Sequence, residues 1–206
     1  SLSLGVTQLR TNENHSLTSG PPVDINHNIR GTYLSWAGNF ADIFLEYADK
    51  ISTRKISNFG GIPNDTLKRG YGYYQNVNIY FGNWGLSTEY KHYSFDRLYG
   101  DITANEYGNQ IEYQQMPTLA KEHNSTLLGR VSHTYSFNDE RGIQFELNGS
   151  IIDLAISMQY AHLSRNEKWR SNSENDWSHS IIDNYLPSSD FSALPYWENY
   201  NEISGY

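Results

Sequence analysis

The side chains most able to do chemistry in this sequence are its carboxylates. Glu174 and Asp176 lie just before Trp177 in a polar stretch, and paired acids beside an aromatic platform are typical of a sugar-processing cleft. A solvated loop has the same composition, and nothing in the sequence places two acids across a cleft. The motifs of serine hydrolases, phosphate-binding loops and zinc peptidases are absent from the chain. We therefore expect no catalytic residues and a protein that is not an enzyme.

Histidine offers no clearer site. The seven histidines are spread along the chain, with no pair at metal-ligand spacing on one element. His92 and His162 fit better as strand-end residues at a water boundary than as ligands. Because the chain also has no cysteine, disulfides and thiolate metal sites are excluded. We expect no metal and no cofactor.

The composition favours strands over helices. Aromatic residues make up 15% of the 206 residues, although the apolar share is only 37%. Tyr, Asn, Ser and Gly dominate, as in strands joined by turns, whereas a helical protein would carry more Ala, Leu, Glu and Lys. The net charge of −8, with 15 Lys and Arg, argues against a nucleic-acid partner. The length suits one domain.

Period-two alternation begins near Gly31, and residues 1–30 are predicted to be a loop or a weak first strand. In 73–81, Val77 and Ile79 face away from Asn76 and Asn78. Tight two-residue turns are predicted at Gly38-Asn39, Gly82-Asn83 and Asn148-Gly149. Further strands are predicted at 84–95, 110–116, 125–137, 143–147 and 151–164.

Long polar connections alternate with these tight turns. They are predicted at 49–70, 96–108, 116–124 and 164–185. Short turns at one rim and long loops at the other are typical of a membrane barrel. The sequence therefore predicts an all-β fold, an antiparallel meander of hairpins that forms a transmembrane β-barrel or part of one, with its wall over 31–206.

The alternation assigns side chains to the two sides of that wall. The apolar set is predicted to face lipid: Val77, Ile79, Phe81, Leu86, Ile152, Leu154, Ile156 and Met158. The polar set is predicted to face the lumen: Asn76, Asn78, Glu89, Lys91, Glu112, Arg130 and Glu146. Aromatic residues near strand ends are predicted to form girdles: Trp84, Tyr93, Phe95, Tyr135 and Phe137. Mutual salt bridging that fills a closed interior would explain the charged residues equally well.

The segment 113–123, Tyr-Gln-Gln-Met-Pro-Thr-Leu-Ala-Lys-Glu-His, is followed by a strand at Leu127. This segment and the order of hairpins around it resemble a family of uncharacterised outer-membrane β-barrel proteins of Bacteroidota, a domain of unknown function. The resemblance covers most of the chain from about Pro22. It implies that the chain is an interior or C-terminal portion of a longer protein.

Two functional hypotheses follow. The first is a non-enzymatic protein of the bacterial outer membrane, acting as a channel, a structural wall or a component of an envelope assembly, with lipid and other envelope proteins as partners. The alternative is a secreted, soluble β-sandwich that binds polysaccharide through loop aromatics such as Trp169, Trp177 and Trp197. Alternation alone does not separate them, because a sandwich also alternates.

Overall fold

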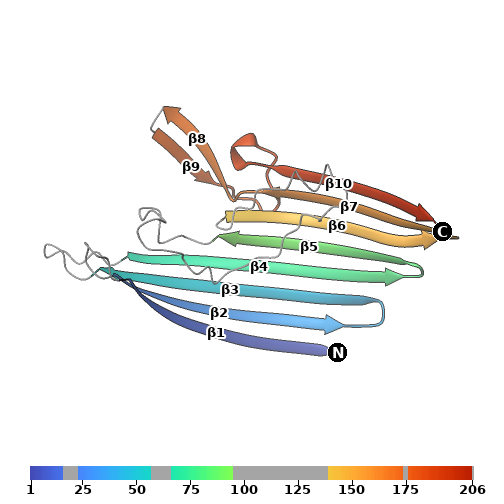
Figure 1. Cartoon of the computed structure of the whole chain (residues 1–206), viewed down its shortest axis with the longest axis horizontal. Coiled ribbons are helices and arrows are strands. Elements are labelled where there is room, and N and C mark those ends of the chain that lie inside the picture. Colours follow the sequence, from blue (N-terminus) through green and yellow to red (C-terminus); the bar gives the residue numbers. More distant parts are fainter. Residues whose placement is uncertain (16–22, 57–65, 95–138, 174–175, 206) are drawn as a thin grey trace.

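The protein is an antiparallel all-β structure, and the predicted meander of hairpins is confirmed. The computed structural model describes residues 1–15, 23–56, 66–94, 139–173 and 176–205. Eight strands form one sheet in the order β1-β2-β3-β4-β5-β6-β7-β10, and β8 and β9 form a separate hairpin (Figure 1). The large sheet comprises β1 (Leu2–His15), β2 (Val23–Ala37), β3 (Ala41–Ile56), β4 (Thr66–Phe81), β5 (Trp84–Ser94), β6 (Asp139–Ile151), β7 (Leu154–Ser164) and β10 (Tyr196–Gly205).

The sheet is open in the described part of the chain. Strands β1 and β10 each pair on one side only, with β2 and β7, so they are its two edges. The tight turns gather at one end of the sheet, whereas the longer connections leave from the other (Figure 1). These two ends are called the turn end and the loop end below.

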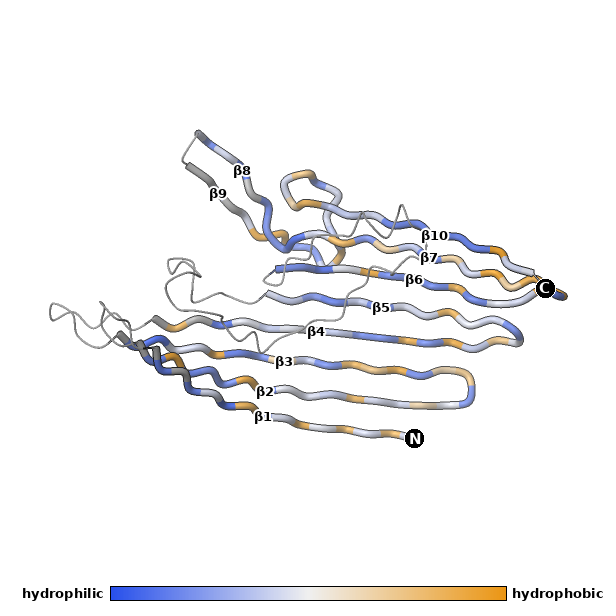
Figure 2. Tube along the Cα trace, in the orientation of Figure 1, coloured by the Kyte–Doolittle hydropathy of each residue, from blue (hydrophilic) through white to orange (hydrophobic). Residues whose placement is uncertain are grey.

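Period-two alternation gives the sheet two different faces. Paired residues of antiparallel strands point to the same side, so the register assigns each residue to a face. The apolar face carries Val77, Ile79 and their partners Thr88 and Leu86. The polar face carries Asn76 and the residues that alternate with this set. In Figure 2, hydrophobic residues recur along the strands mainly at the turn end.

Of the two alternatives predicted for residues 1–30, a loop or a weak first strand, the structure has a strand. This region forms the 14-residue strand β1, and the 15-residue strand β2 begins at Val23. Leu2, Leu4 and Val6 alternate on the apolar face, paired with Trp36, Leu34 and Thr32 of β2. The many Asn and Thr residues hid this pattern, because cross-strand pairing rather than intrinsic propensity holds the strand.

The long connections are shorter than predicted. Strand β3 continues to Ile56 and β4 begins at Thr66, so much of the predicted loop at 49–70 is paired strand. The predicted loop at 164–185 contains the hairpin of β8 (Glu167–Ser173) and β9 (Asp176–Ile181). The loops at 96–108 and 116–124 and the strands at 110–116 and 125–137 lie outside the described residues.

The turn predicted at Asn148-Gly149 is also wrong. Both residues lie inside β6, and the chain turns at Ile152-Asp153 instead. Gly149 is needed for a different reason: the ring of Trp84 on β5 lies 2.2 Å from where a Cβ would stand. The predicted turn at Gly82-Asn83 is confirmed, with Gly82 at φ 58°.

The buried core is small and mixed. Ala161 and Leu163 of β7 are fully buried and pack with Tyr196 of β10. Lys91 and Glu140, by contrast, are charged and as deeply buried as any apolar residue. Two further elements flank the sheet, the β8–β9 hairpin and the short helix η2 (Phe191–Ala193). No helix in the described ranges is long and apolar enough to cross a membrane.

Candidate functional site

The apolar face is a distinctive surface of the described sheet. One register row across it joins Ala41, Ile79, Leu86, Leu147 and Met158, from β3 to β7. Ala41 is buried, but the larger side chains are only partly covered: Ile79 is 38% exposed and Met158 is 48% exposed. Soluble monomers rarely expose a contiguous apolar surface of this extent, so the face needs an apolar partner.

The register brings together most of the residues predicted to face lipid. Seven of the eight share the apolar face, namely Val77, Ile79, Phe81, Leu86, Leu154, Ile156 and Met158. Ile152 was placed with them wrongly. It lies at the tip of the β6–β7 turn, 92% exposed and at φ 56°, because the hairpin turns there rather than at Asn148-Gly149.

Aromatic residues border the apolar face at both ends. Toward the turn end, Phe81 pairs with Trp84. Toward the loop end, tyrosines of four strands border it: Tyr47, Tyr73, Tyr90 and Tyr160. Of the predicted girdle residues, Trp84 lies in this border. Phe95, Tyr135 and Phe137 lie outside the described residues.

Tyr93 was predicted wrongly as a girdle residue. It lies on the polar face, is 2% exposed, and its ring centroid is 5.7 Å from Lys91 Nζ. Its position on β5 has the same parity as Glu89 and Lys91, so the alternation already contained this information. The four tyrosines were missed although each alternates with polar neighbours in the same way.

The borders of the apolar face run obliquely to the register. On β2 the apolar face reaches Trp36 toward the turn end, and the residue of β7 in the same register row is Tyr160. On β7, however, the apolar face extends six residues beyond Tyr160 toward the turn end, to Leu154. The row through Tyr47 on β3 reaches Ser164 on β7, and the bordering Tyr160 is four residues nearer the turn end.

Both borders therefore descend by about one residue per strand. With ~3.3 Å per residue along a strand and ~4.8 Å between strands, this descent tilts the strands by roughly 35–40° from the normal of the apolar band. Between its borders the band covers seven to nine residues of each strand, for example Ala41–Tyr47 and Tyr73–Phe81. That span is about 20–27 Å along the strand.

Beyond the tyrosines, the apolar face becomes polar. Arg30 forms an ion pair with Asp49, with Nη2 and Oδ2 2.6 Å apart. Close to this pair, His92 contacts the Tyr71 hydroxyl at 3.0 Å. The apolar band is thus bounded by water-compatible chemistry on its loop side.

The polar face holds the predicted lumen residues that the structure describes. Asn76, Asn78, Glu89, Lys91 and Glu146 all share it. Asn78 donates to Asn76 at 2.7 Å, and Asn76 donates to Glu89 at 3.3 Å. Glu112 and Arg130 lie outside the described residues. The assignment of this face to a lumen stays a prediction.

A buried ion pair anchors the polar face near the loop end. Lys91 of β5 and Glu140 of β6 are 1% and 2% exposed, and Nζ contacts the Glu140 carboxylate directly. Sequence analysis did not single out Glu140, which precedes the strand predicted at 143–147. The strand β6 begins at Asp139, so Glu140 alternates with its neighbours and points to the side of Lys91.

A second polar network ties the loop end together around Arg141. Its Nε donates to Asn166 Oδ1 at 2.6 Å, and its Nη2 donates to the carbonyl of Ile182 at 3.2 Å. Asn166 in turn donates its side-chain amide to the carbonyl of Tyr93 at 2.6 Å and its backbone N–H to Asp139 Oδ1 at 2.7 Å. These contacts fix the chain after β7 to β5 and β6, which is a structural role.

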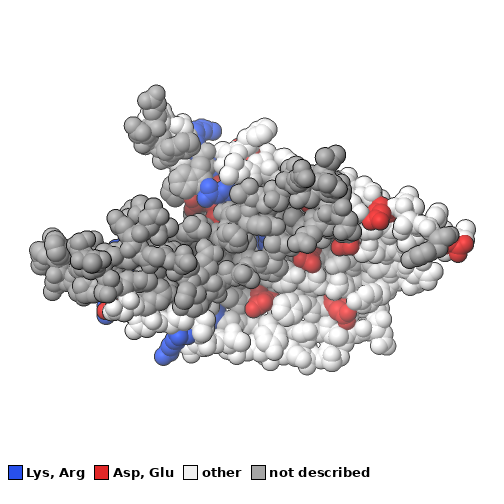
Figure 3. All heavy atoms as spheres, viewed as in Figure 1, with Lys and Arg blue, Asp and Glu red and all other residues white. Residues whose placement is uncertain are grey.

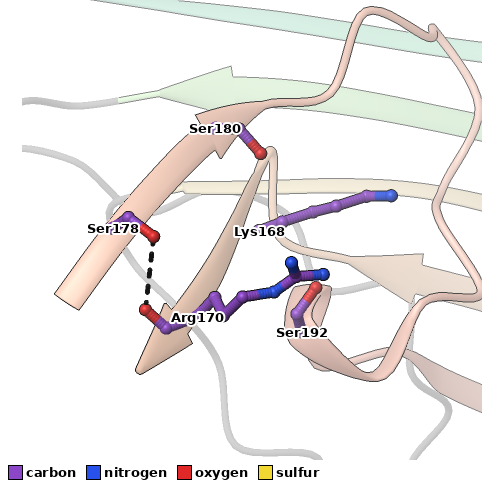
Figure 4. A pocket seen from close by; sticks show the side chains of 5 residues that line it. All are labelled: Lys168, Arg170, Ser178, Ser180 and Ser192. Atoms are coloured by element: carbon purple, nitrogen blue, oxygen red, sulfur yellow. Dashed lines mark hydrogen bonds between the residues drawn. The ribbon is translucent and has the colours of Figure 1, made fainter. Parts of the chain in front are cut away.

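The β8–β9 hairpin carries a small pocket near η2. Lys168, Arg170, Ser178, Ser180 and Ser192 line about 190 Å³, and Figure 4 shows both cationic side chains extending along the same side. Lys168 forms an ion pair with Asp190 at 2.9 Å. Hydrogen bonds from Lys168 and Ser192 hold the pKa of Asp190 well below its usual range. The positive charge of Lys168 is therefore already compensated.

Of the three tryptophans of the polysaccharide hypothesis, the structure describes the side chain of Trp197. Trp197 is stacked on His162, with ring centroids 5.0 Å apart, at the edge strand β10. The side chains of Trp169, Asp176 and Trp177, and all of Glu174, lie outside the described part. No three His, Cys, Asp or Glu side chains of the described ranges gather as a metal site would require.

No family model matches the chain, and no curated protein or solved structure is detectably similar to it.

Proposed function

We propose that this chain is a wall of a bacterial outer-membrane β-barrel, a non-enzymatic protein whose apolar face contacts lipid. The observation that carries the proposal is the oblique apolar band. Strands of outer-membrane barrels tilt by ~35–45°, and the band implies roughly 35–40° from residue positions alone. When strands tilt, their hydrogen-bonded rows run at an angle to the membrane plane. An apolar band that is parallel to the membrane therefore crosses the register obliquely.

The chemistry at the borders of the band supports the same proposal. Tyrosine and tryptophan are favoured at membrane–water interfaces, because their rings are apolar and their polar groups reach water. The tyrosines on one side and Trp84 on the other are arranged in this way. At seven to nine residues per strand, the band is shorter than the ~9–11 residues of a typical tilted membrane strand.

Polar groups inside the band have partners. Gln75 accepts from the Tyr73 hydroxyl at 3.0 Å, and the Thr88 hydroxyl donates to the carbonyl of Val77 at 3.5 Å. Strand β10 departs from the pattern, since Asn199 and Asn201 lie on its apolar side and bond to each other at 3.0 Å. Both residues belong to an edge strand, where a further strand would pair in a closed barrel.

A soluble β-sandwich accounts for less of the structure. In a sandwich a second sheet would bury the apolar face. In the described residues the only other sheet is the β8–β9 hairpin, and the large apolar side chains remain exposed. The proposal also includes the outer-membrane family that 113–123 resembles, the outer-membrane location and other envelope proteins as partners.

The test uses the absence of cysteine from the chain. A bimane probe on Ile79→Cys should be quenched by brominated lipids in vesicles, because Ile79 lies inside the apolar band and its side chain is partly exposed. The matched control is Asn78→Cys, one residue away on the polar face, which should not be quenched. The folded protein should also shift in mobility when it is heated before a detergent gel.

Equal quenching at both positions, or a protein that is monodisperse without detergent, would contradict the membrane wall. In that case the apolar face is covered by protein instead.

A further inference from the structure

The polar face of the described sheet carries several acidic residues, of which Glu140 and Glu198 lie nearer the loop end and Asp42 nearer the turn end. Between them, four strands each carry one further glutamate. They are Glu46 on β3, Glu89 on β5, Glu146 on β6 and Glu202 on β10. No two of them occupy the same register row, so neither the sequence nor the hydrogen-bonded ladder groups them. Figure 3 shows acidic side chains spread over this face, with no Lys or Arg among them toward the turn end.

These glutamates lie on one oblique line. The row through Glu46 passes Lys91 on β5, Gly142 on β6 and Tyr196 on β10. Relative to that row, Glu89 is displaced two residues toward the turn end, Glu146 four and Glu202 six. The displacement is again about one residue per strand. This line is parallel to both borders of the apolar band, so the four carboxylates share one level of the wall.

Among the described residues, the cations of the polar face lie nearer the loop end. Lys50 and Lys91 are both closer to the loop end than the line, and Lys91 contacts Glu140. Hydrogen bonds also orient the carboxylates. Glu146 accepts from Asn148 at 2.9 Å, and Glu202 accepts from the Tyr200 hydroxyl at 2.5 Å. Their charge is therefore concentrated at this level.

A buried amide on the same line independently points to a ligand. Gln159 of β7 is the direct register partner of Glu146 and is displaced four residues from the Glu46 row. It is 2% exposed, and within the described part of the chain neither its side-chain oxygen nor its nitrogen has a hydrogen-bond partner. Buried amides are normally satisfied, so a group not belonging to these residues is expected beside it.

We infer that Glu46, Glu89, Glu146 and Glu202, with the Gln159 amide among them, form a carboxylate ring that binds small inorganic cations in the lumen and excludes anions. Rings of acidic side chains give cation channels their selectivity, because several carboxylates at one level attract cations and repel anions. The amide oxygen supplies a neutral ligand for the same hard cations. The inference rests on the proposed function.

The test is conductance of the full-length protein in a planar bilayer under a KCl gradient. The reversal potential should correspond to K⁺ passing in preference to Cl⁻. It should move toward zero in Glu146→Gln, further in Glu89→Gln/Glu146→Gln, and the selectivity should be lost when all four are replaced. Asp153→Asn removes the same charge from an exposed turn and should leave the reversal potential unchanged.

The outcomes separate the two proposals. A channel that prefers anions, or one whose selectivity is unaltered in the glutamate variants, would overturn the ring. Protein that inserts and is quenched at Ile79→Cys but carries no current would overturn the ring and leave the barrel wall in place. Protein that fails the quenching test would remove both.

Discussion

The apolar face of the large sheet leaves large apolar side chains exposed, whereas the polar face buries charged ones. On the apolar face, Met158 is 48% exposed and Ile79 is 38% exposed, whereas on the polar face Lys91 and Glu140 are 1% and 2% exposed. A soluble protein distributes these types the other way. This contrast is one reason for proposing a barrel wall, because the outer face of such a wall is apolar where it contacts lipid.

The largest effect is expected where the polar face buries charge. Lys91→Met should destabilise the folded protein by about 3–5 kcal/mol, because it leaves the Glu140 carboxylate buried without its cation. Adding Glu140→Gln should recover much of that loss. The free energy of unfolding in detergent or vesicles, measured by urea titration, checks both variants.

The matched control is an ion pair on the other face. The Arg30 side chain, which pairs with Asp49, is 55% exposed. Arg30→Met should therefore lower the free energy of unfolding by less than about 1 kcal/mol. Equal losses of stability in Lys91→Met and Arg30→Met would mean that the Lys91–Glu140 pair is no better shielded from water than the Arg30–Asp49 pair.

A smaller effect is expected from placing one charge on either face. Ile79→Arg should destabilise the protein in lipid vesicles by about 2–4 kcal/mol, because the guanidinium would enter the hydrocarbon. Asn78→Arg, the adjacent residue on the polar face, should be far better tolerated beside Asp42 and Glu146. Unfolding in vesicles compares the two, and similar losses would contradict the assignment of the faces.

The smallest effect is expected in the turn between β6 and β7. Ile152 adopts φ 56°, which is strained for a β-branched residue, and it is 92% exposed. Ile152→Asn should therefore stabilise the protein by about 1 kcal/mol, since asparagine tolerates this conformation. Urea titration checks this as well. A loss of stability would show that Ile152 contributes contacts to its surroundings that outweigh the strain.

The sequence by itself determined the fold class and the two faces. Alternation in 73–91 assigned Val77, Ile79 and Leu86 to one side and Asn76, Glu89 and Lys91 to the other, and the register agrees. It worked because strand geometry points successive side chains to opposite faces whatever the neighbours are. It failed at Asn148-Gly149, where an apparent turn signal is a glycine that makes room for Trp84.

Only the tertiary structure decided how the strands stand relative to one another. Register is a relation between residues far apart in the chain, and it is set by pairing and turn geometry that single strands do not encode. The slope of the apolar band, the common level of the four glutamates and the contact of Lys91 with Glu140 all depend on it. Local alternation therefore fixes which way each side chain points, and cross-strand pairing fixes which side chains act together.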